Sequence, residues 1–590
     1  MAARSQVCRD WWLDRASGRV REPARRAKGV PVSSRLRWLP TAWALLLAGL
    51  MLGPALGSGY VLTYDMVWVP DLALRNDLLG LGSALPRAVP SDALVAVLDE
   101  VVPGMLLQKL VLVGSFVAAG AGGAALVADL SVPVRCLAAS LFVWNPFVVE
   151  RLVLGHWPVL LGYAALPWLV LAAQRYRRAG RLPAALWWLL PLGSLSASAG
   201  LASAVVVLAF GLARDFRANA ALVALVAAAN VPWVTAGLLH AGEALTNRVG
   251  AEVFALRGEG FLAAPLTALG LGGVWNSEVV PATREGVLAV VALGVIAALA
   301  GLGARGWLRC VGSRDAAAFA VCWALGWGVA VFSWAAPDAM AWLAAEVPGA
   351  GLLRDGSRLL GLCALATFTL CAHGAERLGG LIPGRGERLV VTGLLALVPV
   401  SLMPDAAWGS SGALSAVDYP ASYASAREAI GDADGADVLV LPFSSYRAPA
   451  WNDGHKVLDP LGRYLEPDYV ASDELTVAGK TIVGEDPRGD AVRRALAAAP
   501  DARGAALARL GIGTVVIDKT APGTSPDVPG RVISDTPELT VLALGNPAPQ
   551  GPPRSWLVAM LLAWLVWVAM GTVGVVRACR ERSSRNPSVP

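Results

Sequence analysis

Residues 557–576 read LVAMLLAWLVWVAMGTVGVV, a stretch without a charged side chain that is long enough to cross a bilayer as one helix. Similar apolar blocks recur at residues 39–56, 105–126 and 201–212. Over all 590 residues the hydrophobic fraction is 56%, the charged fraction 16% and the mean hydropathy +0.56. Soluble domains carry about 25% charged residues. We therefore predict an α-helical polytopic membrane protein.

The distribution of basic residues predicts the orientation of the chain. Arginines cluster in the first 38 residues, in short loops between apolar blocks and after the last block, although the net charge is only +5. Basic residues accumulate on the cytoplasmic side of membrane proteins. We therefore expect a multi-pass protein of the plasma membrane with both termini cytoplasmic and about twelve spans. Nucleic-acid binding, the other explanation for basic clusters, is not expected.

This topology divides the chain into five parts. A basic cytoplasmic tail (1–39) precedes a membrane domain of eleven spans (40–403), whose longest outer loops cover 59–103 and 239–285. A mostly hydrophilic segment (404–553) follows, then the last span (554–577) and a second cytoplasmic tail (578–590). Apolar runs at 437–442, 513–518 and 539–544, with a helical segment at 490–510 broken near 498–501, predict a small extracytoplasmic α/β domain before the last span.

The first outer loop contains the candidate catalytic acids. Asp65 follows the first span by a few residues, in GYVLTYDMVWVPD (59–71), and Asp92 and Asp99 lie further along. A carboxylate at the membrane boundary can act as a general base on an acceptor hydroxyl, or hold a divalent cation (Mg²⁺ or Mn²⁺) against a phosphate. The alternatives are that Asp65 is a solvated loop residue and that Asp99 belongs to the polar start of the second span.

Two further clusters of ionisable residues stand between apolar spans. Residues 144–158, WNPFVVERLVLGHWP, contain Glu150, Arg151 and His156. Ionisable groups at membrane depth are costly and often functional, and Arg151 and His156 are suited to a phosphate. An internal Glu150–Arg151 pair with an interfacial histidine is equally compatible with this pattern.

The second cluster is LLRDGSRLL (352–360), which places Arg354 and Arg358 at the predicted outer mouth of a span. Arginine is unfavourable at a helix N-terminus, and a nearby anion would offset that cost. A lipid phosphate and a structural salt bridge are equally good candidates for the anion.

The topology, Asp65 and the stretches 86–92, 144–157 and 353–358 resemble the GT-C superfamily of integral membrane glycosyltransferases, and more closely an actinobacterial branch of GT-C-like membrane proteins. The resemblance implies a catalytic acid in the first outer loop, a polyprenyl-phosphate sugar donor and transfer on the outer face. In actinobacteria it implies arabinose or mannose as the sugar and a cell-wall glycan or lipoglycan as the acceptor. The first loop lacks the Asp-Asp or Asp-x-Asp pair of many such enzymes, which leaves the identity of the catalytic acid open.

The leading hypothesis is therefore an inverting membrane glycosyltransferase. Asp65 acts as base or metal ligand, and Arg151, His156, Arg354 and Arg358 hold the donor phosphate. Aromatic faces pack on sugar rings, so a turn of the α/β domain supplies candidate acceptor contacts: Tyr446, Arg447, Trp451 and Asn452. An ordinary turn explains those four residues as well. The rival hypothesis is a non-catalytic scaffold or transport factor for envelope assembly, and a lipid or solute transporter is a third.

Overall fold

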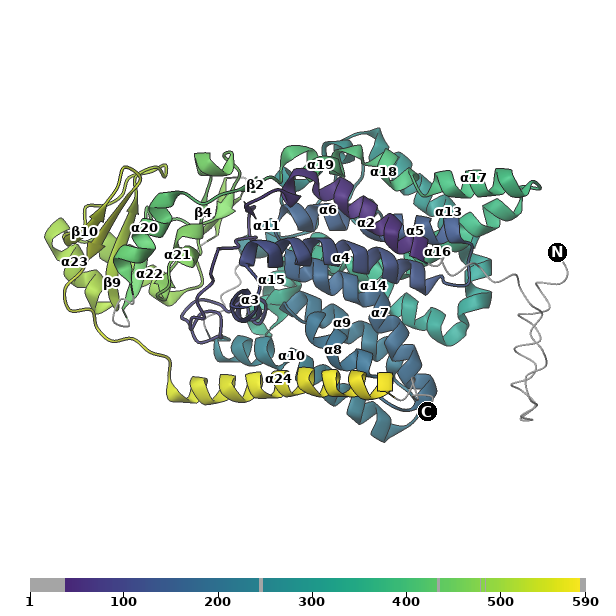
Figure 1. Cartoon of the computed structure of the whole chain (residues 1–590), viewed down its shortest axis with the longest axis horizontal. Helices are drawn as coiled ribbons and strands as arrows, with labels where there is room; N and C mark the ends of the chain where they lie inside the picture. Colours follow the sequence, from purple (N-terminus) through teal and green to yellow (C-terminus); the bar gives the residue numbers. More distant parts are fainter. Residues whose placement is uncertain are drawn as a thin grey trace.

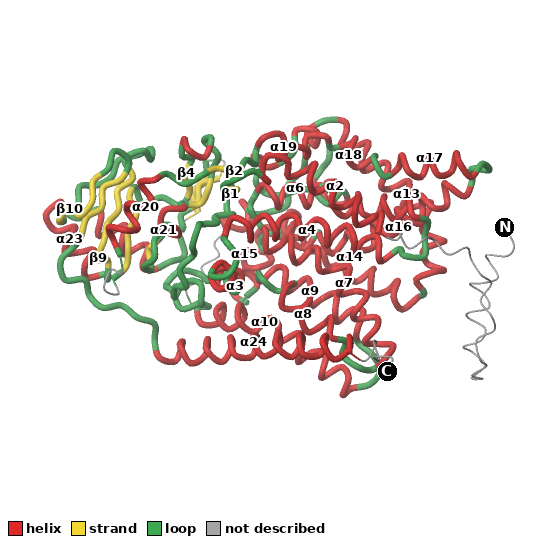
Figure 2. The backbone as a smooth tube through the Cα atoms, in the orientation of Figure 1, coloured by secondary structure: helices red, strands yellow, loops and turns green. Residues whose placement is uncertain are grey.

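The computed structural model describes residues 38–242, 248–347, 349–431, 436–477, 479–482 and 484–583. It consists of a helical bundle with an α/β domain at one end (Figures 1 and 2). Residues 1–37 and 584–590 of the two predicted tails lie outside the described residues.

Eight helical segments in the described part of the chain are long and apolar enough to cross a membrane, as expected of a multi-pass protein. Three of them lie within a few residues of the spans that the sequence predicts at about 104–128, 219–238 and 316–334: α4 (Gly104–Leu126), α10 (Phe216–Leu239) and α14 (Ser313–Ala335). The other five are α2 with η2 (Leu39–Leu52, Gly53–Leu56), α5 with α6 (Val132–Val143, Pro146–Val153), α7 (Trp157–Ala179), α13 (Val287–Val311) and α24 (Arg554–Ser583). The last helix packs along α8 and α10 and ends far from the α/β domain (Figure 1).

The remaining predicted spans correspond to shorter or less apolar helices. They are α8 (Ala184–Leu192), α9 (Ala197–Gly211), α16 (Gly361–Gly380) and the pair α17 and α18 (Arg385–Leu395, Val398–Leu402). The count of twelve spans therefore stays a prediction. Within the bundle, α16 lies against α13 at Gly303 and Gly374, where a methyl group on either glycine would overlap the backbone of the other helix. Small residues allow this close approach between membrane helices.

The sequence predicts a span at about 136–149 followed by an outer turn at 150–157, but Asn145-Pro146 ends α5 and starts a second helix, α6. The Asn145 side chain accepts a 3.1 Å hydrogen bond from the Val148 amide, and Pro146 occupies the first turn of α6. Both features are typical helix starts. Glu150 and Arg151 consequently lie on the buried helix α6 rather than in the turn expected at 150–157.

The α/β domain is built on a five-stranded sheet in the order β10-β11-β9-β3-β6. The three predicted strands are confirmed as β3 (Asp437–Leu441), β9 (Ile512–Asp518) and β11 (Leu539–Ala543), and the predicted helix with its break as α22 (Pro487–Leu496) and α23 (Pro500–Arg509). Strand β3 runs parallel to β9 and β6 (Tyr469–Val470), while β11 is antiparallel to β9 and β10 (Arg531–Asp535). Apolar residues of α22 and α23 pack on the sheet in a separate core cluster.

The first outer loop packs against this domain through ion pairs and hydrogen bonds. Its short helix α3 (Ser91–Asp99) lies at the end of the bundle that faces the domain (Figure 1). Asp92 of α3 forms a 2.5 Å ion pair with Arg463 of the domain, and both side chains are nearly buried. Asn76 donates a 2.7 Å hydrogen bond to Asp468, and Arg75 donates to the Leu465 carbonyl at 3.1 Å. The loop and the domain thus form one interface.

We expect Arg463→Met to destabilise this interface by about 3–5 kcal/mol, because it leaves the Asp92 charge buried without its partner. The measurement is the thermal unfolding of the protein in detergent. Lys519→Met, which removes an exposed pair with Asp535, is the control and should leave the Tm nearly unchanged. An Arg463→Met protein as stable as the wild type would show that the pair is not needed for docking.

Candidate functional site

Asp65 lies in a tight turn that follows the first span. Thr63 and Met66 exchange backbone hydrogen bonds of 3.3 and 2.8 Å, and Tyr64 between them has a φ of 38°. A non-glycine residue in this left-handed region is uncommon and is held there by its surroundings. The turn is fixed to the loop after α6, because the Asp65 amide donates to the Leu154 carbonyl at 3.1 Å.

Gly155 makes the close approach of the two loops possible. Its φ is 77°, and a Cβ at this position would overlap the Met66 amide. Only glycine satisfies both demands. His156 follows directly and is brought beside Asp65 for this reason.

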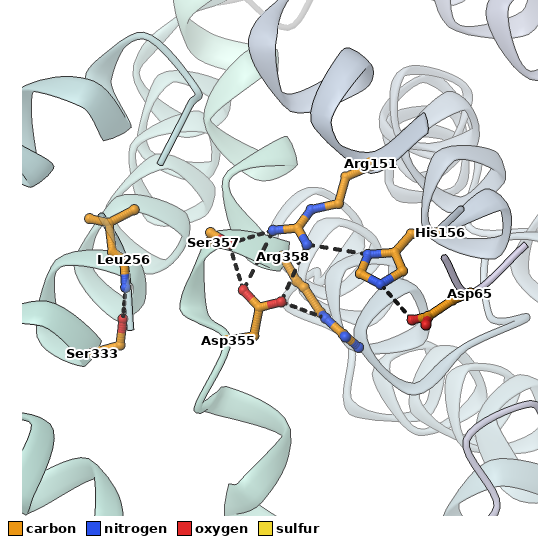
Figure 3. Close-up of polar contacts among 8 residues, drawn as sticks. All are labelled: Asp65, Arg151, His156, Leu256, Ser333, Asp355, Ser357 and Arg358. Atoms are coloured by element: carbon orange, nitrogen blue, oxygen red, sulfur yellow. Dashed lines mark hydrogen bonds and ion pairs between the residues drawn. The ribbon is translucent and has the colours of Figure 1, made fainter. Parts of the chain in front are cut away.

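A chain of polar contacts runs from Asp65 into the bundle (Figure 3). His156 Nε2 lies 3.1 Å from an Asp65 oxygen, and its Nδ1 lies 3.2 Å from Arg151. Arg151 pairs with Asp355 at 3.3 Å, and Arg358 pairs with the same carboxylate at 2.9 Å. Arginine can only donate, so Nδ1 accepts and the Nε2 proton faces Asp65. The contacts therefore favour one neutral tautomer of His156.

Asp65, His156, Arg151, Asp355, Ser357 and Arg358 form one polar cluster, which has a buried end and an open end. The Arg151 and Asp355 side chains are only 1% and 5% exposed, and Ser357 hydrogen-bonds to both. In contrast, the side chains of Asp65 and Arg358 are 43% and 34% exposed. One carboxylate and one guanidinium thus remain accessible to a ligand, supported from behind by a buried ion pair.

The electrostatics keep the open carboxylate ionised. Desolvation would raise the pKa of Asp65, but hydrogen bonds from His156 and Tyr446 and the charge of Arg358 lower it to about 2. Burial and the positive charge of Arg358 together hold the pKa of His156 below its ordinary value, against the influence of Asp65. At neutral pH the pair is therefore a carboxylate and a neutral imidazole.

A hairpin of the α/β domain closes over Asp65. Tyr446 of β4 (Tyr446–Arg447) donates a hydrogen bond to the second Asp65 oxygen. The partner strand β5 (Val457–Leu458) is joined to the Asp65 turn, because the Leu458 amide donates to the Tyr64 carbonyl at 2.7 Å. The sequence placed Tyr446 among the acceptor contacts, and the structure adds its contact with Asp65.

The other predicted acceptor residues serve contacts within and around the domain. Arg447 is buried beside Asp459 at 2.8 Å and Asp518 at 3.7 Å. Trp451 packs against Tyr419 and Tyr423 with ring centroids 5.3 and 5.7 Å away. Asn452 is buried and donates to the Leu62 carbonyl at 3.2 Å. These three residues have no recorded contact with Asp65.

The other candidate acids have different surroundings from Asp65. Asp92 pairs with Arg463, as described above. Asp99 ends α3 rather than starting the second span, and it accepts a 2.9 Å hydrogen bond from the Leu72 amide. Burial raises the pKa of Asp99 to about 6, with the charges of Asp71 and Glu100 adding to the effect.

Arg354 faces away from the carboxylate that binds Arg358. It pairs with Glu485 of the domain at 3.3 Å and lies over the Phe254 ring at 4.8 Å. The nearly buried Glu485 also binds Arg87 at 3.1 Å. Arg354 therefore links the first outer loop, the second outer loop and the domain.

Two buried carboxylates were not among the predicted site residues. The sequence shows that Asp355 lies three residues before Arg358, but it does not show that Asp355 pairs with Arg151. Glu259, in the second outer loop, has no local sequence signal. It binds Arg284 at 2.7 Å and accepts a hydrogen bond from the Gly273 amide. Arg151 pairs with Asp355 rather than with Glu150, which was one of the two alternatives from the sequence.

An open cavity of about 460 Å³ adjoins the second outer loop. It lies between residues of that loop and the region where α14 ends, with Leu256, Arg257 and Trp334 in its lining. The Leu256 amide donates to Ser333 at 3.2 Å, near the segment that carries Asp355 (Figure 3).

The described residues do not form a ready metal site. They contain no group of three or more His, Cys, Asp or Glu side chains placed to hold an ion. Asp65 is the candidate metal ligand from the sequence, and both of its oxygens are occupied by hydrogen bonds. The donor set around Asp65 thus does not fit Mg²⁺ or Mn²⁺, which prefer several oxygen ligands.

Comparisons with known proteins identify solved structures that share the fold of this chain. No protein-family model and no curated protein matches the chain. Two cryo-EM structures of the arabinofuranosyltransferase AftD from Mycobacteria, one of them of a point mutant, share the fold with TM-scores of 0.53 and 0.54. Each is 18% identical and covers 87% of this chain, which spans only 40% and 42% of theirs. This agrees with the GT-C-like fold expected from the sequence. A shared fold does not itself assign a reaction.

The lowered pKa of His156 predicts a pH-dependent stability. An unfolded chain takes up a proton at this histidine near pH 6.5. Folded His156 does not, so the free energy of unfolding falls as the pH drops through that value and towards the folded pKa. We expect the Tm to fall less between about pH 7.5 and 5.5 in His156→Gln than in the wild type.

The control is His455→Gln, which removes a histidine outside the cluster and should keep the wild-type pH dependence. An unchanged slope in His156→Gln would show that folding does not lower the pKa of His156.

Proposed function

We propose that this protein is an inverting membrane glycosyltransferase that uses a polyprenyl-phosphate sugar. The observation that carries the proposal is the pairing of an ionised, accessible Asp65 with an accessible Arg358 at the open end of one cluster. A transferase of this kind needs a base for the acceptor and a cation for the leaving phosphate. Both are present within one network, at the end of the bundle that carries the outer loops.

In the proposed reaction, Asp65 removes the proton from an acceptor hydroxyl as its oxygen attacks the anomeric carbon. A new glycosidic C–O bond forms on the face opposite the phosphate. The bond from the anomeric carbon to the phosphate oxygen breaks, and its electron pair leaves with the polyprenyl phosphate. Inversion follows from the single displacement, and Asp65 holds the released proton.

The four predicted phosphate ligands divide into two groups. Arg358 is accessible and contacts the phosphate, because charge-assisted hydrogen bonds stabilise the negative charge that grows there. Arg151 is too buried to reach a ligand, so it and His156 position Asp65 instead. Arg354 holds the domain through Glu485. The divalent cation suggested by the sequence has no part in the proposed reaction, because the donor set around Asp65 does not fit one.

The resemblance and the AftD structures support the substrate class that we propose. AftD is an arabinofuranosyltransferase, which favours arabinose over mannose as the sugar that we propose is transferred here. We propose a cell-envelope glycan or glycolipid as acceptor and the outer face of the plasma membrane as the location. The α/β domain lies over the open end of the cluster, where an extended acceptor would approach.

We expect Asp65→Asn to lower kcat by about 10²- to 10⁴-fold, the usual effect of losing a general base. The assay uses purified protein, a polyprenyl-phosphate arabinose donor and an arabinan acceptor, with donor binding measured separately and expected to persist. Asp71→Asn is the matched control, since Asp71 is a more exposed acid of the same loop that pairs with Arg427.

Equal activity of Asp65→Asn and wild type would remove Asp65 from the mechanism. If the wild type transfers no sugar from either an arabinose or a mannose donor, the non-catalytic scaffold takes the place of the transferase.

We expect Arg358→Gln to raise the KM for the donor about 10- to 100-fold, because a hydrogen bond to a charged group contributes roughly 1.5–3 kcal/mol. Initial rates at varied donor concentration measure the effect. Arg385→Gln, an exposed arginine of α17 at the other end of the bundle (Figure 1), should leave the KM unchanged. A KM unaffected by Arg358→Gln would place the phosphate elsewhere.

A further inference from the structure

The hydrogen bond from Tyr446 to Asp65 lies where the substrate of the proposed reaction must bind. An acceptor hydroxyl that is about to lose its proton has to donate a hydrogen bond to the base. One Asp65 oxygen already accepts from His156, and Tyr446 donates to the other. The Tyr446 hydroxyl therefore lies where the hydroxyl of a sugar acceptor would lie, but it does not itself receive the sugar.

We propose that the Tyr446 hydroxyl occupies the position of the attacking acceptor hydroxyl, and that a glycan acceptor displaces it whereas water does not. The inference rests on the proposed function and adds a specificity-determining residue to it. Tyr446 then protects an activated donor from hydrolysis when no acceptor is bound, a general requirement for enzymes that handle reactive donors.

Tyr446 is unsuited to acting as a proton donor itself. Burial, followed by the charge of Asp65, raises the pKa of its hydroxyl well above the ordinary value. The tyrosine accordingly keeps its proton next to an ionised carboxylate. Its contact with Asp65 is therefore a hydrogen bond between a neutral phenol and a carboxylate. A hydrogen bond from another hydroxyl group can replace it without a change in net charge.

Only the side chain of Tyr446 has to move. The next residue, Arg447, is fixed by buried ion pairs with Asp459 and Asp518, and the Tyr64 backbone bonds to the neighbouring strand β5. The Tyr446 ring itself has a loose contact with Tyr64, with ring centroids 6.3 Å apart and the planes tilted by 60°. Displacement therefore requires the rotation of one side chain on a hairpin whose neighbouring residues are fixed.

Displacement also prepares the base for the reaction. The Tyr446 hydrogen bond is one of the contacts that lower the pKa of Asp65. Exchange of this bond for one from a sugar hydroxyl replaces a donor that keeps its proton with a donor that can give it up to Asp65 at the moment of attack. Water can make a similar contact but lacks the additional binding energy that a long glycan gains along the α/β domain.

The test is Tyr446→Phe in the full-length protein, with Tyr64→Phe as the matched control. Both changes remove one hydroxyl and keep the ring, but the Tyr64 hydroxyl binds Glu278 at 2.6 Å and does not touch Asp65. The probe is polyprenyl-phosphate arabinose. Release of free arabinose is measured without acceptor, and sugar transfer is measured with an arabinan acceptor.

We expect Tyr446→Phe to raise donor hydrolysis roughly tenfold or more, the effect of freeing one charged hydrogen-bond acceptor. Transfer should stay within a few-fold of wild type, and the acidic limb of its pH profile should shift to higher pH because the pKa of Asp65 rises. Tyr64→Phe should match the wild type in all three measurements.

Two results would overturn the inference. Hydrolysis equal to that of the wild type would show that Tyr446 does not exclude water, and loss of transfer without increased hydrolysis would make Tyr446 a positive contributor to catalysis. Failure of the proposed function itself would be distinct, since the wild type would then neither transfer nor hydrolyse the donor.

Discussion

The buried ion pair between Arg151 and Asp355 is the interaction on which the site depends. It joins residues 204 positions apart in the sequence, one on α6 and one in the segment before α16. Two charges are stable in the interior of a protein only as partners. Removal of either one leaves the other buried without a counter-charge. The pair orients His156 on one side and Arg358 on the other, so Asp65 and Arg358 at the open end share a single buried support.

The α/β domain contributes residues to the site and is fixed to the membrane domain by several contacts. Glu485 holds Arg354 and Arg87, Arg463 holds Asp92, and Tyr446 reaches Asp65. These contacts fix the first outer loop between the bundle and the domain. The strained turn at Tyr64 is stabilised by the same arrangement, since its backbone bonds to the β4–β5 hairpin. An acceptor that bound the domain would thereby be placed next to Asp65, the base of the proposed reaction.

Local patterns predicted much of the fold. Apolar blocks and arginine clusters located the long helices, and β-rich runs located β3, β9 and β11, because both signals lie within a single element. The short helices were harder to predict, since Asn145-Pro146 interrupts an apolar stretch without changing its composition. Asp65, His156, Arg151 and Arg358 were singled out by charge in apolar surroundings. Their partners were not predicted, because Asp355 and Tyr446 are brought there by contacts across 204 and 381 residues. Glu259 had no sequence signal at all.

The central claim is that Asp65 and Arg358 face the two ends of the bond that is broken. The most direct measurement is a cryo-EM structure with a polyprenyl-phosphonate arabinose analogue, which binds like the donor but cannot transfer its sugar. Our account predicts phosphonate oxygens within hydrogen-bonding distance of Arg358, and the anomeric carbon facing the Asp65 oxygen that now binds Tyr446. An analogue bound with its phosphonate away from Arg358, or its sugar away from Asp65, would contradict it.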